Sequence, residues 1–126
     1  MNFLPSNDRK YLENRGLRFS EVEDGKQKGI ILREFRLPSG RYDVQKADIL
    51  ILLPSGYPDV PPDMFYLLPW AKLLEGTKYP KAANQAFSFK SQKWQRWSRH
   101  NSQWRPGVDG IWTMLKRIEN ALEVAA

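Results

Sequence analysis

The chain contains no cysteine and only one histidine, His100, among its 126 residues. The absence of cysteine excludes disulfide bonds, thiolate metal sites and a thiol nucleophile. A single imidazole also excludes a metal site built from several histidines. Phosphate-binding glycine motifs of the G-x-x-x-x-G-K-[ST] and G-x-G-x-x-G types are missing as well. The sequence therefore predicts neither a metal site nor another cofactor.

The chain also lacks a long hydrophobic run. No segment approaches the ~20 apolar residues that a membrane-spanning helix needs, and the N-terminus has no basic region followed by an apolar one. Hydrophobic residues make up 41% and charged residues 27% of the chain, as in an ordinary soluble globular protein. We therefore expect a single domain over residues 1–126, located in the cytoplasm and without a membrane partner.

The net charge of +6 comes from one part of the chain. Residues 76–108 contain seven basic side chains and no acidic one, whereas the remainder contains 13 basic and 14 acidic residues. The same segment includes Trp94, Trp97 and Trp104. A basic segment of this kind attracts an acidic partner.

Two segments have the pattern of helices. Residues 6–15 predict a short helix, and residues 109–124 predict a longer one with Asp109 as its N-cap. The second segment has an apolar face with helical spacing. Its members are Ile111, Leu115, Ile118 and Leu122.

Four segments have the pattern of strands, at residues 17–24, 29–38, 47–54 and 63–69. Residues 76–107 show no clear period and are expected to form a long irregular segment. The order of the elements predicts an α+β fold. It consists of an antiparallel meander sheet of about four strands, a short N-terminal helix and a C-terminal helix.

A proline-rich elbow, SGYPDVPPDMFYLLP, occupies residues 55–69. Tyr-Pro-x-x-Pro-Pro before the last strand, followed later by Trp-x-Pro before a long helix, resembles the ubiquitin-conjugating (UBC) fold. The matching residues are Tyr57, Pro58, Pro61, Pro62, Trp104 and Pro106. The finer sequence is similar to the bacterial branch called prokaryotic family E. This resemblance implies a UBC-like fold and two protein partners, a ubiquitin-like modifier and a ubiquitin-like activating enzyme.

The elbow prolines are interpreted as scaffold. Proline fixes φ and has no backbone N–H, so Pro58, Pro61 and Pro62 end strand pairing and set the direction of the chain. The resemblance implies that Trp104 fills the gap between its loop and the final helix.

The chain departs from the family pattern at the nucleophile. Conjugating enzymes carry a cysteine shortly before the Trp-x-Pro, preceded by His-Pro-Asn. Here Arg96 stands eight residues before Trp104, and no His-Pro-Asn occurs. Thioester transfer is therefore not open to this chain.

A hydroxyl is the remaining type of nucleophile, and Ser98 is the nearest one. In this reading His100 is its base, and Asn101 or backbone N–H groups stabilise the oxyanion of a serine oxyester reaction. The alternative is that Ser98 and His100 only form local hydrogen bonds with the backbone. Whether the chain is an enzyme stays open.

The basic and aromatic residues before Trp104 also have two interpretations. Trp94 and Trp97 either cover the core beneath a long loop or grip the tail of a partner. Arg96 and Arg99 are either a solvated basic face or a partner-binding surface.

Three functions follow from these patterns. The first is a component of a bacterial ubiquitin-like conjugation pathway that accepts or positions the C-terminus of the modifier. The second is a non-catalytic UBC-like module that binds the modifier or its activating enzyme. The third, ranked well behind, is binding of single-stranded nucleic acid, since basic residues interleaved with tryptophan suit stacking and phosphate attraction. The basic excess is confined to one segment and no nucleic-acid-binding motif is present, so nucleic acid is not a predicted partner.

Overall fold

The computed structural model describes residues 3–100 and 103–126. These residues form two helices, α1 (Ser6–Asn14) and α2 (Ile111–Val124), and a short 3-10 helix, Glu75–Thr77. The strands are β1 (Phe19–Asp24), β2 (Gln27–Arg36), β3 (Lys46–Leu53), β4 (Phe65–Leu68), β5 (Gln85–Phe89) and β6 (Gln92–Trp97). Within this part of the chain neither helix combines the length and the apolar character that a membrane crossing requires.

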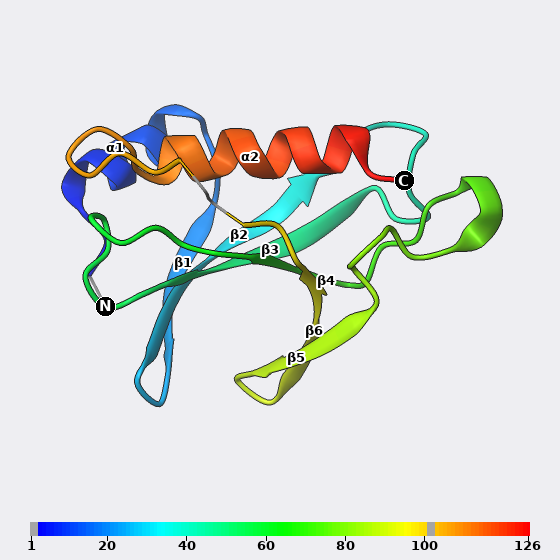
Figure 1. Ribbon diagram of the computed structural model, residues 1–126, viewed down its shortest axis with the longest axis horizontal. Coiled ribbons are helices and arrows are strands. Elements are labelled where there is room, and N and C mark those ends of the chain that lie inside the picture. Colours follow the sequence, from blue (N-terminus) through cyan, green and yellow to red (C-terminus); the bar gives the residue numbers. More distant parts are fainter. Residues whose placement is uncertain (1–2, 101–102) are drawn as a thin grey trace.

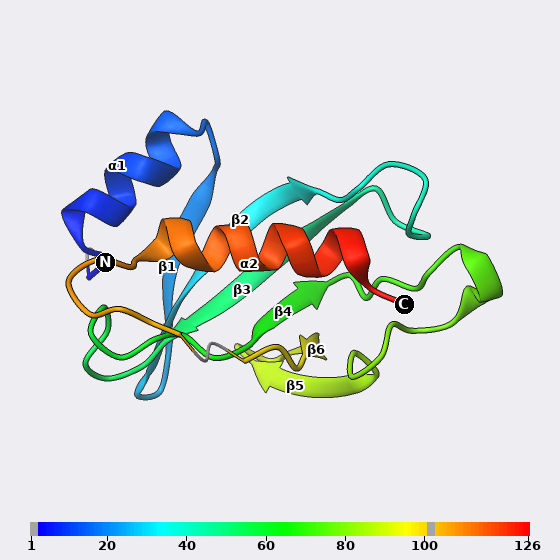
Figure 2. The same ribbon diagram turned by 45° about the horizontal axis from the view of Figure 1, so that its top comes forward.

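All six strands belong to one antiparallel sheet with the order β1-β2-β3-β4-β6-β5. The first four strands form a meander, and the β5–β6 hairpin is added beside β4. Helix α2 lies across one face of the sheet, and α1 lies beside the first turns of α2 (Figure 1). Figure 2 shows the same helix crossing over β2 and β3. The predicted α+β architecture with its two helices is therefore confirmed.

The predicted number of about four strands is too low. The β5–β6 hairpin lies inside residues 76–107, the segment that was expected to be irregular. Its turn residues, Lys90 and Ser91, have φ angles of 50° and 64°, and such left-handed turns are usually signalled by Asn-Gly or a similar pair. Because this chain uses Lys-Ser instead, the sequence gives no turn signal at that point.

The main core lies between the sheet and the helices. The predicted apolar face of α2 is part of it, since Ile111, Leu115, Ile118 and Leu122 are each at most 1% exposed. The N-cap residue is Gly110, one position after the predicted Asp109, so the helix itself begins at Ile111. This core holds α2 firmly against the sheet.

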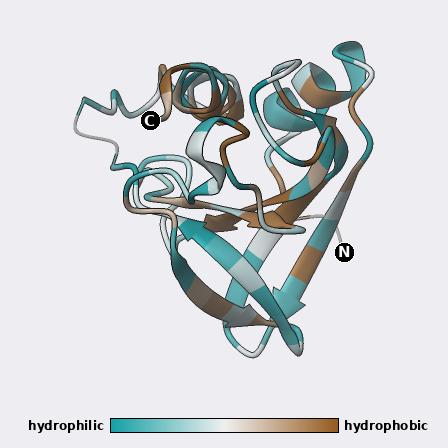
Figure 3. Cartoon of the chain, turned by 90° about the vertical axis from the view of Figure 1, so that its right-hand side faces the viewer, coloured by the Kyte–Doolittle hydropathy of each residue, from teal (hydrophilic) through white to brown (hydrophobic). Residues whose placement is uncertain are grey.

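A second, smaller core lies on the other face of the sheet. Its buried members are Ile31, Leu50, Tyr66, Phe89 and Trp94. The β1–β2 and β5–β6 hairpins extend on the side away from α2, and Figure 3 shows the strands converging there. The backbone N–H of Lys90 donates to the Asp24 carboxylate at 2.8 Å, so the two hairpin turns are in contact.

Gln95 fixes the connection between β4 and β5. Its side chain is fully buried, and its Oε1 accepts a hydrogen bond from the Ala71 N–H at 2.9 Å. Its Nε2 donates to the carbonyl groups of Ala71 and Ala83 at 2.9 and 2.8 Å. A buried amide with this many good partners replaces the secondary structure that the connecting segment lacks.

Candidate functional site

The elbow between β3 and β4 is a closed, hydrogen-bonded turn. The Tyr57 N–H donates to the Pro54 carbonyl at 3.0 Å, and the Asp59 N–H donates to the Gly56 carbonyl at 2.9 Å. The Tyr57–Pro58 peptide bond is cis. Gly56 has a φ of 90°, and a Cβ there would lie 2.9 Å from the Val60 side chain, so the turn requires glycine.

A buried carboxylate joins the elbow to both helices. Asp8 of α1 is 2% exposed and accepts a hydrogen bond from the Tyr57 hydroxyl. Its other oxygen accepts the Ile111 N–H at 3.3 Å, at the start of α2. Burial raises the pKa of Asp8, and the hydrogen bonds from Tyr57 and Ile111 oppose this shift. Burial and the neighbouring carboxylate also raise the pKa of Tyr57 well above its ordinary value.

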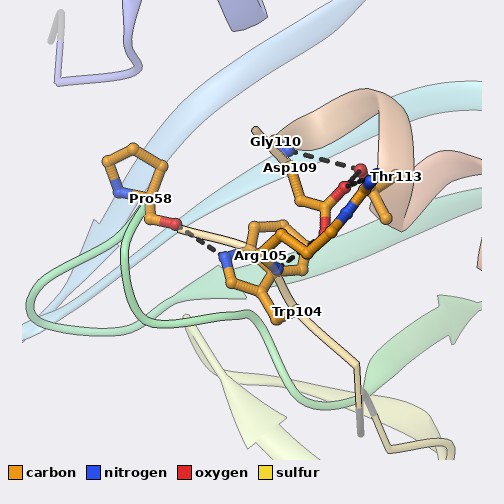
Figure 4. Close-up of polar contacts among 6 residues, drawn as sticks. All are labelled: Pro58, Trp104, Arg105, Asp109, Gly110 and Thr113. Atoms are coloured by element: carbon orange, nitrogen blue, oxygen red, sulfur yellow. Dashed lines mark hydrogen bonds and ion pairs between the residues drawn. The ribbon is translucent and has the colours of Figure 1, made fainter. Parts of the chain in front are cut away.

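Trp104 connects the elbow to the loop before α2. Its indole Nε1 donates to the Pro58 carbonyl at 2.8 Å, as Figure 4 shows. The Trp104 and Tyr57 rings lie 6.4 Å apart between centroids. The Tyr-Pro and Trp-x-Pro motifs are therefore in direct contact, although 46 positions separate the bonded residues.

The loop between Trp104 and α2 is held in place by hydrogen bonds. The Asp109 carboxylate accepts the Arg105 N–H at 2.8 Å, the Arg105 guanidinium at 3.0 Å and the Thr113 hydroxyl at 2.9 Å (Figure 4). The hydrogen bonds from Arg105 lower the pKa of Asp109 to about 2. Pro106 lies in the turn closed by the Asp109 N–H, which donates to the Arg105 carbonyl at 2.9 Å.

Glycine is required at position 110, where the loop before α2 lies close to Asp8 of α1. A Cβ at this position would lie 2.6 Å from the Trp112 ring and 2.8 Å from the Asp8 carboxylate. No side chain fits in that space without moving the Asp8 carboxylate.

The structure does not join Ser98 and His100 into the predicted catalytic pair. The Ser98 N–H donates to the Ala82 carbonyl at 3.0 Å, and its half-buried side chain makes no hydrogen bond to His100. His100 Nδ1 lies instead 2.8 Å from the carboxylate of Asp63, a residue that sequence reasoning missed. Asn101 lies outside the described residues. The catalytic role of these three residues stays a prediction.

Trp94 and Trp97 were considered as partner-binding residues, and this interpretation is wrong. Their exposures are 1% and 0%, because each fills a core on one side of the sheet. Trp97 stacks on Phe65 with ring centroids 5.3 Å apart. The tryptophans therefore stabilise the fold and are not accessible to a partner.

Arg96 and Arg99 do not form one surface. Arg96 pairs with Tyr66 across β4 and β6, and cross-strand partners share a face, so Arg96 lies on the side away from α2. Its guanidinium donates to the Gln85 side chain within the hairpin. Arg99 lies on the side of α2, with its guanidinium carbon 5.2 Å from the Trp97 ring centre. The single basic face that the sequence suggested is thus divided between two sides of the sheet.

A hollow of about 230 Å³ lies between the end of β6 and helix α2, and we call it the α2 groove. Its buried apolar bottom includes Phe65, Met114 and Ile118. Its polar residues include Arg99, His100 and Arg117. Sequence reasoning missed Arg117, because only the packing of α2 brings it close to residues 99 and 100.

Comparison with protein families matches residues 4–125 to prokaryotic E2 family E. The chain therefore belongs to this family of E2-like proteins, as the elbow and the Trp-x-Pro motif indicated. Membership of the family indicates a role in ubiquitin-like protein conjugation. Neither the curated proteins nor the solved structures compared with the chain gave a match.

Proposed function

We propose that this chain binds and positions a ubiquitin-like modifier without forming a thioester with it. The observation that carries the proposal is the combination of an E2-like frame with Arg96 in the place of the nucleophile. Arg96 lies within β6, is half-buried and is bonded to Gln85. The elbow and the loop before α2 are each held by several hydrogen bonds, which suits a rigid docking surface.

The frame also explains why binding can persist without thioester chemistry. Asp8, Tyr57 and Trp104 connect α1, the elbow and the loop before α2 by buried or half-buried hydrogen bonds. None of these contacts depends on a nucleophile. A surface held by such contacts loses little conformational entropy when a partner binds, which favours affinity.

The experiment is a binding measurement with a ubiquitin-like protein and an E1-like activating enzyme from the same organism. Isothermal titration should show a reversible complex with the modifier in the absence of ATP. The matched control is the same modifier with its C-terminal tail removed, which should bind more weakly. The proposal is wrong if the modifier does not bind under these conditions, whether or not the activating enzyme does.

A second candidate is acyl transfer through a serine oxyester, and the Asp63–His100 contact favours it. A carboxylate at Nδ1 orients an imidazole so that its Nε2 can accept a proton, as catalytic bases require. Incubation with modifier, activating enzyme and ATP would then give an adduct that resists thiol reductants and is cleaved by strong base. Ser98→Ala should abolish this adduct, whereas Ser88→Ala, an exposed serine on β5, should not.

Binding of single-stranded nucleic acid loses its main support. Stacking of bases requires accessible aromatic rings, and both Trp94 and Trp97 are buried. Binding that falls steeply with salt in an electrophoretic shift assay would restore this function.

A further inference from the structure

We propose that the α2 groove binds the C-terminal carboxylate of an extended peptide tail between Arg117 and Arg99. The inference deepens the proposed function and rests on it for the identity of the protein that carries the tail. It specifies recognition of a free chain end by charge and hydrogen bonding, with no covalent bond to this chain.

The size of the groove fits a chain end. Its volume of about 230 Å³ is below the ~300–1,000 Å³ of typical sites for drug-sized ligands and cofactors. Its bottom is formed by apolar side chains that are almost completely buried, including Phe65, Met114 and Ile118. A groove of this kind accommodates the last small or apolar side chain of a peptide.

The charge around the groove fits an anion. Arg99 and Arg117 line it, and among the residues that the structure describes no acidic side chain does. His100 also lines it, and the carboxylate of Asp63 next to it is already engaged by the imidazole. Five other arginines are neutralised by carboxylates. These pairs are Arg9–Glu21, Arg15–Glu119, Arg18–Glu34, Arg33–Asp48 and Arg105–Asp109.

Arg117 lines the groove with donors that the described residues leave unused. Its Nε is buried, and within residues 3–100 and 103–126 its guanidinium has neither a hydrogen bond nor an ion pair. The Nε atoms of Arg41 and Arg96 and the indole N–H groups of Trp94 and Trp97 also lack a partner, so the unpaired donor of Arg117 supports a ligand only together with the groove beside it. The position of Arg117 beside an open groove makes a ligand oxygen a suitable acceptor.

Arg99 is held in place on the other side of the groove. Its Nη1 donates to the carbonyl groups of Lys81 and Ser98, both at 3.2 Å, and its guanidinium packs over the Trp97 ring. The remaining N–H groups have no partner among the described residues. A planar guanidinium held in this way matches the geometry of a carboxylate, and the apolar bottom of the groove disfavours a more highly charged phosphate.

The test uses a synthetic hexapeptide of alanine, valine and leucine with an acetylated N-terminus. One form has a free C-terminal carboxylate and the other a C-terminal amide. Titrations followed by NMR chemical shifts should show that the wild-type protein binds the acid at least tenfold more tightly than the amide. Arg117→Gln should reduce this ratio to below twofold, and Arg99→Gln should reduce it as well. Lys116→Gln, an exposed cation one position earlier on α2, is the matched control and should keep the full ratio.

Two results would overturn the proposal. The first is equal affinity for the acid and the amide in the wild-type protein. The second is binding of inorganic phosphate at least as tight as that of the acid and with the same dependence on Arg117, which would make the groove a general anion site. Thermal unfolding of each variant checks that the variant is folded. A folded variant that no longer prefers the acid peptide over the amide has then lost the binding site and not the fold.

A parallel titration with the ubiquitin-like protein separates this inference from the proposed function. If the modifier binds the wild-type protein and Arg117→Gln equally well, the groove assignment is wrong and the proposed function stands. If the acid peptide binds in an Arg117-dependent manner and the modifier does not bind, the groove assignment stands and the modifier is not its partner.

Discussion

The hydroxyl of Tyr57 donates a hydrogen bond to the buried carboxylate of Asp8, which lies 49 positions earlier in the chain. The same carboxylate accepts the N–H of Ile111 at the first turn of α2. One side chain of α1 thus fixes the position of the elbow relative to the C-terminal helix. The tyrosine of the Tyr-Pro motif therefore has a structural role that the prolines cannot supply.

Replacing Tyr57 with Phe should lower the free energy of unfolding by ~1–3 kcal/mol, because one oxygen of a buried carboxylate loses its donor. Urea denaturation measures this change. Tyr79→Phe is the matched control, since the Tyr79 hydroxyl makes no hydrogen bond among the described residues, and it should change stability much less. Equal effects of the two substitutions would contradict the structural role of the Tyr57–Asp8 hydrogen bond.

Asp8 should make the protein less stable as the pH rises. Its pKa in the folded state is raised above the ordinary value of 3.8, so between these two values the folded protein binds more protons than the unfolded chain. The stability of the wild-type protein relative to Asp8→Asn should therefore fall as the pH rises through this window and then become constant. Urea denaturation at a series of pH values tests this. If the stability difference between the wild-type protein and Asp8→Asn rises with pH, folding lowers the pKa of Asp8 instead of raising it.

Asp109 should have the opposite effect. Arg105 lowers its pKa to about 2 from the ordinary value of 3.8, so its contribution to stability is present above 3.8 and is lost as the pH falls toward 2. The stability difference between the wild-type protein and Arg105→Gln should shrink over this acidic range. Arg36→Gln, an exposed cation on β2, should show no such dependence.

Gln95 should be essential for the order of the segment between β4 and β5. Gln95→Leu keeps a similar volume but leaves the N–H of Ala71 and the carbonyl groups of Ala71 and Ala83 without their partners. We expect a loss of at least ~2 kcal/mol in the free energy of unfolding, since each buried unpaired group costs ~1–3 kcal/mol. The control is Gln92→Leu, an exposed position on the same strand. Similar losses for both would show that the side chain of Gln95 is not the cause.

Gln95 also illustrates why the β5–β6 hairpin could not be predicted. The regular meander and the apolar face of α2 were predictable, because a strand or helix with one buried face has a clear period. Strand β6 has Trp94 in one core, Trp97 in the other and a buried glutamine between them, so neither alternation nor an apolar run is visible.

The candidate site was predictable only in part. The contact between the Tyr-Pro and Trp-x-Pro motifs confirms that both belong to one structural unit. The α2 groove combines residues 99 and 100 with Arg117, and nothing in the local sequence relates them. The separation of Arg96 from Arg99 follows from strand pairing, which residue spacing alone did not reveal because the strand itself was not recognised.

The contact between Asp24 and Lys90 links the opposite ends of the sheet. β1 and β5 are its two edge strands, and the turns that follow them lie together although 66 positions separate the bonded residues. Both hairpins cover the same small core of five buried residues. Opening either hairpin exposes this core to water, so the two hairpins should open as one cooperative unit. Amide protons at the two edges should therefore exchange with the solvent through the same opening event, and strengthening one turn should protect the strand at the far edge.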